Sequence, residues 1–310
     1  MSGNKFLKDI RESAGIRLAV LFGSFFILLT LSSIISVFVD KAPGGLRAHA
    51  LISAAISALI VFCLPAFILG KFSSNHSLEW LELTRAPKIR ALFGVVIIYL
   101  ISMPAMEWLI EWNSSLHLPQ SLASLENLLR QWESSSEEST KLLLDAHGWL
   151  PVLTGVIVIG VLTGFAEELF FRGGLQGTLV RASIGKHVAV WTAAFIFSTM
   201  HFQFFGFVPR LIMGAFFGYL LIWTRSIWVP VFAHVLNNSA VVVTSALTGD
   251  ISTSLIDETN VTLYLGNSLT VLSSVILTAL FLILCRRTLF TSKLIHKKWQ
   301  RSQLPPVSGR

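Results

Sequence analysis

Charged residues are scarce in this chain. They make up 13% of its 310 residues, whereas an ordinary soluble domain carries about 25%. Hydrophobic residues make up 53%, and the mean hydropathy is +0.69. This composition argues against a water-soluble domain, and it indicates that the solvent around the folded chain is a lipid bilayer.

Cysteine is also scarce. Cys63 and Cys285 lie in or at the end of apolar stretches, and their separation does not match the spacing of metal ligands. We therefore expect no disulfide framework. The chain has no internal repeat, no glycine loop that could hold a phosphate, and no basic face interleaved with aromatic residues. Its net charge of +7 therefore does not indicate nucleic-acid binding.

Long apolar runs are what the sequence does contain. A spanning helix needs about 20 such residues, and lipid leaves no partners for unpaired backbone groups, so each run is expected to be helical. The predicted fold is an all-α, polytopic transmembrane helix bundle of roughly eight spans. The expected spans are 18–39, 48–69, 91–112, 150–171, 188–207, 211–223, 227–247 and 264–285.

Lysine and arginine are unevenly placed between these runs. If the chain crosses eight times, its basic connections fall on one side, and the positive-inside rule makes that side cytoplasmic. Both termini are then cytoplasmic, and the absence of an organellar signal favours a bacterial cytoplasmic membrane. The basic groups are the N-terminal tail, Lys71, Arg85, Lys88, Arg90, Arg181, Lys186, Arg225 and the tail 286–310.

Four regions follow from this pattern. They are N-terminal transmembrane helices (1–112), an extramembrane segment (113–148), a membrane core (149–247), and a last transmembrane helix with a basic cytoplasmic tail (248–310). In the extramembrane segment, leucines repeat at helical spacing among serines and acids. This predicts an amphipathic surface helix with a flexible serine-rich stretch; a lid that controls substrate access is the alternative.

Ionisable residues interrupt the apolar helices of the second half. They are Glu167, Glu168, Arg172, His201 and His234. A charged residue at the centre of a spanning helix costs about 2.5–3.5 kcal/mol on insertion scales, so these groups are expected to face one another rather than lipid. They form the candidate functional site.

The two glutamates have different expected roles. Glu168 and Arg172 are one helical turn apart and can pair along one face. Glu167 is rotated by about 100° on the same helix and lacks an obvious local partner, which suits a general base. A structural ion network of the three residues is the competing interpretation.

The two histidines also allow a functional and a structural interpretation. His201 follows Phe197 by one helical turn, and such a histidine can be a packing residue. His234 and Asn238 share a helix face. Their side chains could stabilise an oxyanion, or they could bond to neighbouring helices.

The order of these motifs resembles the CPBP family, which includes the type 2 CAAX prenyl endopeptidases and the Abi bacteriocin-processing and immunity proteins. That family carries E-E-x-x-x-R, F-x-x-x-H and H-x-x-x-N on successive membrane helices. Each listed position is matched here, between Glu167 and Asn238. The stretch from Gly214 to Asn238, with Trp228 and Pro230, is also similar to the family, so the resemblance covers about 152–247.

The resemblance implies a membrane-embedded endopeptidase in which Glu167 and His201 activate a water. His234 and Asn238 would bind the oxyanion, while Glu168 and Arg172 would brace the site. Substrates would be membrane-associated peptides or proteins, either lipidated and CAAX-like or carrying a leader peptide.

No cofactor is expected. Glutamate and histidine can bind zinc, but the sequence lacks the H-E-x-x-H spacing, so a metal-free mechanism is favoured over a metallopeptidase. Two further classes of function stay open: a non-catalytic immunity or scaffold protein, and a proton-coupled transporter.

The expected spans conflict with this mechanism in one respect. Glu167 lies near one end of its span, whereas His201 lies about 20 Å along the next helix. Either the stretch 173–187 re-enters the membrane, with Gly173, Gly174 and Gly177 permitting irregular backbone, or the span boundaries are wrong by several residues.

Overall fold

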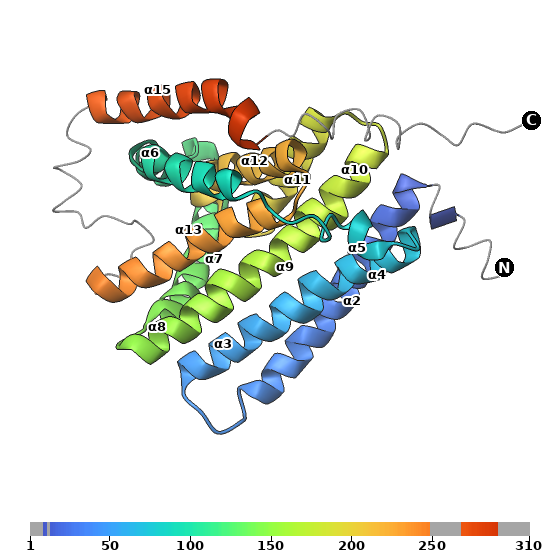
Figure 1. Ribbon diagram of the computed structural model, residues 1–310. Coiled ribbons are helices and arrows are strands. Elements are labelled where there is room, and N and C mark those ends of the chain that lie inside the picture. Colours follow the sequence, from blue (N-terminus) through green and yellow to red (C-terminus); the bar gives the residue numbers. More distant parts are fainter. Residues whose placement is uncertain (1–8, 11–12, 249–267, 291–310) are drawn as a thin grey trace, which may run out of the picture.

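The computed structural model describes residues 9–10, 13–248 and 268–290, and the elements in these ranges are all helices (Figure 1). Six of these helices are long and apolar enough to cross a membrane. The protein is therefore an all-α, multi-pass membrane protein. The candidate spans are Ala14–Val39, Leu46–Ser73, Ile89–Ser114, Trp149–Arg181, Phe204–Thr224 and Trp228–Thr248.

The first half of the chain forms three of these spans and one amphipathic helix. Its elements are α2 (Ala14–Val39), α3 (Leu46–Ser57), η1 (Ala58–Cys63), α4 (Leu64–Ser73), α5 (Ser77–Trp80), α6 (Ile89–Ser114), η2 (Gln120–Leu122) and α7 (Ala123–Leu144). The second half contains α8 (Trp149–Gly155), η3 (Val156–Thr163), α9 (Gly164–Glu168), η4 (Leu169–Gln176), α10 (Gly177–Arg181), α11 (Lys186–Thr199), η5 (Phe204–Gly206), α12 (Phe207–Thr224), α13 (Trp228–Thr248), α15 (Ser268–Cys285) and η6 (Arg286–Phe290).

The long helix that runs from α8 to α10 is central to the bundle. On one side it packs against the hairpin of α2 with α3 and α4, and on the other side it contacts α13 (Figure 1). Helices α11 and α12 form an adjacent pair, while α6 and α15 pack on each other across the upper part of the view. Five of the six predicted site residues lie on this long helix or on α13, and His201 is the exception.

Basic connections meet at one end of this bundle. Arg181 donates to the Trp80 carbonyl at 2.6 Å, and Arg225 pairs with Glu82 at 3.3 Å. The Trp228 indole donates to the Leu83 carbonyl at 2.9 Å. The predicted count of eight spans is not confirmed, because six of the described helices qualify. The cytoplasmic location of the two termini, which lie outside the described residues, stays a prediction.

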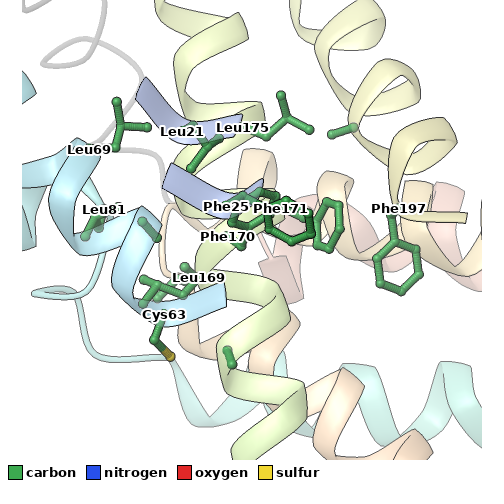
Figure 2. Packing of buried hydrophobic residues seen from close by; sticks show 14 of the residues in the cluster. Leu21, Phe25, Cys63, Leu69, Leu81, Leu169, Phe170, Phe171, Leu175 and Phe197 are labelled. Carbon is green, nitrogen blue, oxygen red and sulfur yellow. The ribbon is translucent and has the colours of Figure 1, made fainter. Parts of the chain in front are cut away.

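Aromatic rings join the N-terminal hairpin to the central helix. Phe170 lies against Phe25, with ring centroids 5.2 Å apart, and edge-on to Phe62 at 5.6 Å. Phe171 meets Phe197 of α11 edge-on at 5.1 Å. Figure 2 shows this row of rings, with Phe197 at its margin. Because lipid is as apolar as these side chains, close packing rather than the hydrophobic effect holds such helices together.

The boundary of the fourth expected span, 150–171, was wrong. The helix continues to Arg181, so Glu167 lies near the middle of a 33-residue span. Gly173 and Gly177 do not break it: a Cβ on Gly173 would lie 3.3 Å from Leu81, and one on Gly177 would lie 2.7 Å from the Arg181 guanidinium. These glycines provide space for close neighbours, and the stretch up to Arg181 does not re-enter the membrane.

The fifth and sixth expected spans were also placed incorrectly. Helix α11 ends at Thr199 instead of continuing to residue 207, and α12 begins at Phe207 instead of residue 211. A continuous apolar sequence hides this break, because hydropathy does not distinguish a helix from an apolar turn. His201 consequently lies in a turn between two helices.

The serine-rich stretch of the segment 113–148 is helical rather than flexible. The hydroxyls of Ser135 and Ser139 bond to carbonyls one turn earlier, at 3.0 Å each. These serines therefore lie within α7. The beginning of the last expected span, 264–267, and the tail 291–310 lie outside the described residues.

Candidate active site

Glu168 is the centre of a buried polar network. Its side chain is fully shielded from solvent. Arg172 donates to its Oε1 atom at 2.8 Å, and Nδ1 of His234 lies 2.8 Å from the same oxygen. The expected pairing within the helix is present, and a second partner comes from α13. Two donors thus hold one carboxylate oxygen.

Arg172 links three helices. Besides Glu168, its guanidinium donates to the Gly214 carbonyl of α12 at 2.9 Å. The guanidinium carbon lies 4.8 Å from the centroid of the Phe197 ring and 5.4 Å from that of Phe217. Aromatic faces attract a cation most strongly where water is excluded. The Arg172 charge is therefore balanced by a carboxylate, a carbonyl and two rings.

Glu167 is less constrained. Its Oε2 atom lies 3.7 Å from Nε2 of His234, and its side chain is 12% exposed. This distance exceeds that of a hydrogen bond. Oε2 of Glu168 also lacks a hydrogen-bond partner, but it is buried, so Glu167 is the carboxylate that water can reach more easily.

His201 presents one ring nitrogen to the site. Its Nδ1 atom lies 2.8 Å from the Phe197 carbonyl. Since a carbonyl only accepts, this contact assigns the proton to Nδ1 and leaves Nε2 as an acceptor in the neutral ring. Glu167, Arg210 and His234 all act electrostatically on this ring. The structure thereby groups His201 with the glutamates.

The His234 ring is fixed by aromatic contacts. It stacks on Phe217 with centroids 5.1 Å apart, and Phe197 approaches edge-on at 5.9 Å. Helix α13 packs closely on α9 beside this ring. A Cβ on Gly164 of α9 would lie 3.3 Å from the Val235 backbone nitrogen, so the absence of a side chain at Gly164 allows the close approach. The ring therefore stays between the two glutamates.

Asn238 lies one turn beyond His234 and bonds elsewhere. Its Nδ2 atom donates to the Ile159 carbonyl at 3.2 Å, and its Oδ1 atom accepts from Asn237 at 3.2 Å. The amide nitrogen has a second proton. The role of Asn238 in binding an oxyanion stays a prediction.

Sequence reasoning missed Arg210, Gly214 and Phe217. Arg210 could have been found, because it is an ionisable residue within an otherwise apolar run, which is the signal that identified the others. Gly214 accepts from Arg172 through its carbonyl, and Phe217 stacks on His234. Both contacts depend on how α12 packs, and nothing in the local sequence indicates them.

The side chains were also compared with a zinc site. Among the described residues, no group of three or more histidine, cysteine, aspartate or glutamate side chains is placed to hold a metal ion. Glu168 already accepts from Arg172 and His234. The arrangement of these described side chains therefore does not fit a zinc site.

The sequence was compared with models of known protein families and with known proteins. A model described as type II CAAX prenyl endopeptidase Rce1-like matches residues 149–240. No solved structure matches this chain.

Two curated relatives come from Bacillus subtilis (strain 168). The chain is 32% identical to "Uncharacterized protein YpbD" over 83 residues, which are 26% of this chain and 39% of that protein. It is 30% identical to "Putative membrane peptidase YdiL" over 106 residues, which are 34% of this chain and 42% of that protein. The chain thus spans about two fifths of the relatives that it matches.

The matched region contains all six predicted site residues and the three helices that hold the buried network. The resemblance seen in the motifs is thereby confirmed. Residues 149–240 of this chain are similar to the Rce1-like type II CAAX prenyl endopeptidases.

Proposed function

We propose that this protein is a membrane endopeptidase in which Glu167 and His201 activate a water molecule for attack on a peptide carbonyl. The observation that carries the proposal is the contrast between two adjacent glutamates. Glu168 is held by Arg172 and His234 at 2.8 Å each, while Glu167 lies 3.7 Å from its nearest ion-pair partner. One carboxylate braces the site, and the other is free to move a proton.

The chemical step needs a base and a return path for its proton. Glu167 takes a proton from water, assisted by Nε2 of His201, and the water oxygen forms a bond to the carbonyl carbon. The carbonyl oxygen then carries negative charge. When the carbon–nitrogen bond breaks, the same proton passes to the leaving amine, as general acid–base catalysis requires.

The developing oxyanion needs hydrogen-bond donors. Nε2 of His234 faces the Glu167 side of the site, and it can donate when the imidazole carries both protons. Asn238 offers the second proton of its amide nitrogen. Donors that are fixed before the reaction lower the barrier because they need no reorganisation.

The substrate class follows from the surroundings and from the family. Glu167 lies near the middle of a 33-residue apolar helix, so the scissile bond must come from a peptide at the membrane. Lipidated CAAX-like chains and leader peptides of membrane-associated proteins are the two candidate classes. The proposed location is the bacterial cytoplasmic membrane.

Cleavage by purified protein tests this proposal. Wild type, Glu167→Gln and His201→Ala would be incubated in liposomes with a prenylated CAAX peptide and with leader peptides, with and without a chelator. Loss of the base is expected to lower turnover by about 10²–10⁴-fold. Glu138→Gln, which changes an exposed carboxylate on α7, is the matched control and should cleave like wild type.

Each outcome has a defined meaning. Cleavage that survives the chelator and disappears in Glu167→Gln supports the glutamate mechanism, whereas loss on chelation indicates a metallopeptidase. Full activity in both site variants would overturn the mechanism. If wild type cleaves neither substrate, a scaffold or immunity role, or a proton-coupled transporter, becomes the better account.

A further inference from the structure

His201 lies in a short connection between α11 and α12, residues 200–206, which we call the His201 connector. Its next residue, Phe202, has φ +53°. A bulky residue rarely adopts this left-handed conformation and keeps it only where its surroundings hold it. The direction of the His201 ring therefore depends on what contacts the connector.

Helix α7 contacts the connector through three residues of about one helical turn. Oε2 of Glu133 accepts the Phe205 amide at 3.1 Å. The Trp132 ring meets Phe202 edge-on, with centroids 6.2 Å apart. The Arg130 guanidinium carbon lies 3.9 Å from the centroid of the Phe205 ring. A polar, an aromatic and a cationic contact thus hold one turn of backbone.

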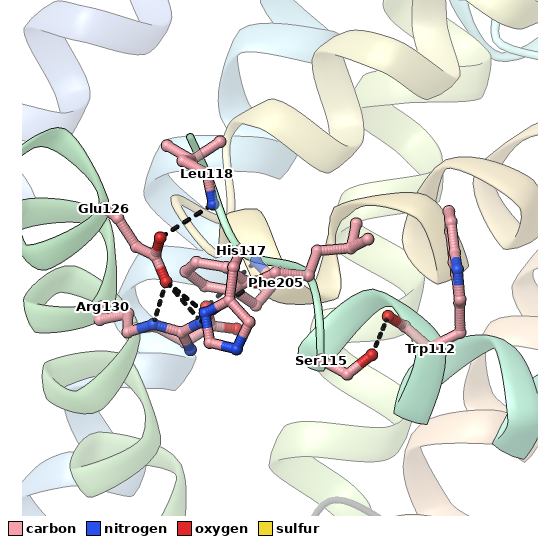
Figure 3. A network of polar contacts seen from close by, with 9 residues as sticks. Trp112, Ser115, His117, Leu118, Glu126, Arg130 and Phe205 are labelled. Atoms are coloured by element: carbon pink, nitrogen blue, oxygen red, sulfur yellow. Dashed lines mark hydrogen bonds and ion pairs between the residues drawn. The ribbon is translucent and has the colours of Figure 1, made fainter. Parts of the chain in front are cut away.

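Arg130 is itself fixed in place. Figure 3 shows its guanidinium beside Phe205 and bound to Glu126, with contacts of 2.8 and 2.9 Å. Hydrogen bonds from His117, the Leu118 amide and Arg130 lower the pKa of Glu126 to about 2. Glu126 is therefore charged at neutral pH, and its pair with Arg130 persists.

The end of α6 holds the other side of the connector. Asn113 is 1% exposed. Its Oδ1 atom accepts the Val208 amide at 2.7 Å, and its Nδ2 atom donates to the Phe204 carbonyl at 3.4 Å. Asn113 and Glu133 together bind three backbone groups of residues 204–208.

Arg210 connects these contacts to the candidate site. Its guanidinium donates to Gln203 of the connector, and it interacts electrostatically with Glu133 of α7 and with Glu167. Gly206 makes room for it, because a Cβ there would lie 2.7 Å from the guanidinium. Arg210 thus lies within electrostatic range of both the α7 carboxylate and the candidate base.

We infer that α7 is a structural support of the active site, and that Glu133 and Asn113 are positioning residues that hold the His201 connector in its working conformation. The catalytic part of this inference rests on the proposed function; the structural part does not. Neither residue touches the reacting atoms. Both act through the backbone that carries His201, and both lie in the segment 113–148 or at the end of α6, outside the family match.

Two substitutions of Glu133 distinguish the effect of its hydrogen bond to the Phe205 amide from the effect of its negative charge. Glu133→Gln keeps an acceptor for the Phe205 amide, while Glu133→Ala removes it. Glu138→Ala, at an exposed carboxylate of the same helix, is the control. Asn113→Ala provides an independent variant if Glu133→Ala folds poorly.

The first measurement is hydrogen–deuterium exchange over residues 200–208, which does not depend on catalysis. Glu133→Ala should speed exchange there by about 10- to 100-fold, the expected effect of losing a bond to a charged acceptor. Glu133→Gln should restore slow exchange. The second measurement is peptide cleavage, in which Glu133→Ala should lower kcat at nearly constant KM, and Glu133→Gln should recover most of it.

The outcomes distinguish this inference from the proposed function. If wild type does not cleave but exchange changes as expected, the proposed function fails and the support by α7 stands. Wild-type exchange and wild-type kcat in Glu133→Ala would overturn the inference. A rise in KM alone, with unchanged exchange, would also overturn it, because α7 would then be a substrate-contacting lid.

Discussion

Glu167 and Glu168 are chemically identical side chains with different surroundings. Successive residues of a helix point about 100° apart, so one carboxylate faces Arg172 and the other turns toward His201 and the edge of His234. Glu168 is fully buried, whereas the Glu167 side chain is 12% exposed. Two carboxylates with separate roles, set by their environments, are a common basis for acid–base chemistry.

Glu168→Gln is expected to act on stability as well as on rate. The substitution leaves the Arg172 guanidinium, which is 1% exposed, without its carboxylate. Removing one partner of a buried pair costs about 3–5 kcal/mol. Thermal unfolding in detergent, measured together with the yield of folded protein, should show this loss for Glu168→Gln and little change for Glu167→Gln. Equal stability of the two variants would contradict the brace assigned to Glu168.

The site residues were predicted from the sequence because each is polar in an apolar run. Their partners were not. The bond between Glu168 and His234 joins residues 66 positions apart, and nothing near either residue indicates it. The sequence placed His234 with Asn238, whereas the structure places its ring between the two glutamates and turns the Asn238 amide toward Ile159.

The length of α11 bears on the separation between Glu167 and His201, which the expected spans made too large for the two residues to share a water. Helix α11 has 14 residues, or about 21 Å, which is shorter than the roughly 30 Å of hydrocarbon. If α11 starts at the membrane surface, we expect its end, with His201, to lie within the depth of the membrane. Glu167 lies at a similar depth because its own helix extends to Arg181. A short helix beside a long one brings the two residues together.

Close contact between α9 and α13 depends on Gly164. A Cβ there would lie 3.3 Å from the Val235 nitrogen and 3.6 Å from the His234 carbonyl carbon. Gly164→Leu should push α13 away, cost about 1–3 kcal/mol by overpacking, and reduce cleavage further by moving His234. Gly23→Leu, on α2 where a Cβ meets nothing within 4 Å, is the control. Unfolding temperature and turnover should fall together in the first variant only.

For the molecule as a whole, the two ends of the bundle differ. Trp80, Glu82 and Leu83 gather the basic connections at one end. Away from that end, α7 covers the His201 connector. The predicted topology makes the first end cytoplasmic, since basic connections stay on that side.

Cysteine labelling tests this orientation. Ser183 lies at the basic end and Ser134 on α7, and both are exposed. In a background with Cys63 and Cys285 replaced by alanine, a membrane-impermeant maleimide should label Ser134→Cys in intact spheroplasts. Ser183→Cys should be labelled only in inside-out vesicles. Labelling of both from the same side would refute the topology.

The sequence by itself determined that this is an all-α membrane protein, which residues form its candidate site, and which family they resemble. Hydropathy and the cost of placing a charge in lipid depend only on single residues and short runs of residues. Both can therefore be evaluated from the sequence alone. Only the tertiary structure decided where α11 ends, which carboxylate His234 binds, and that Glu133 holds Phe205 from 72 positions away. Those features depend on packing between distant helices, where the fit of side chains decides which residues meet.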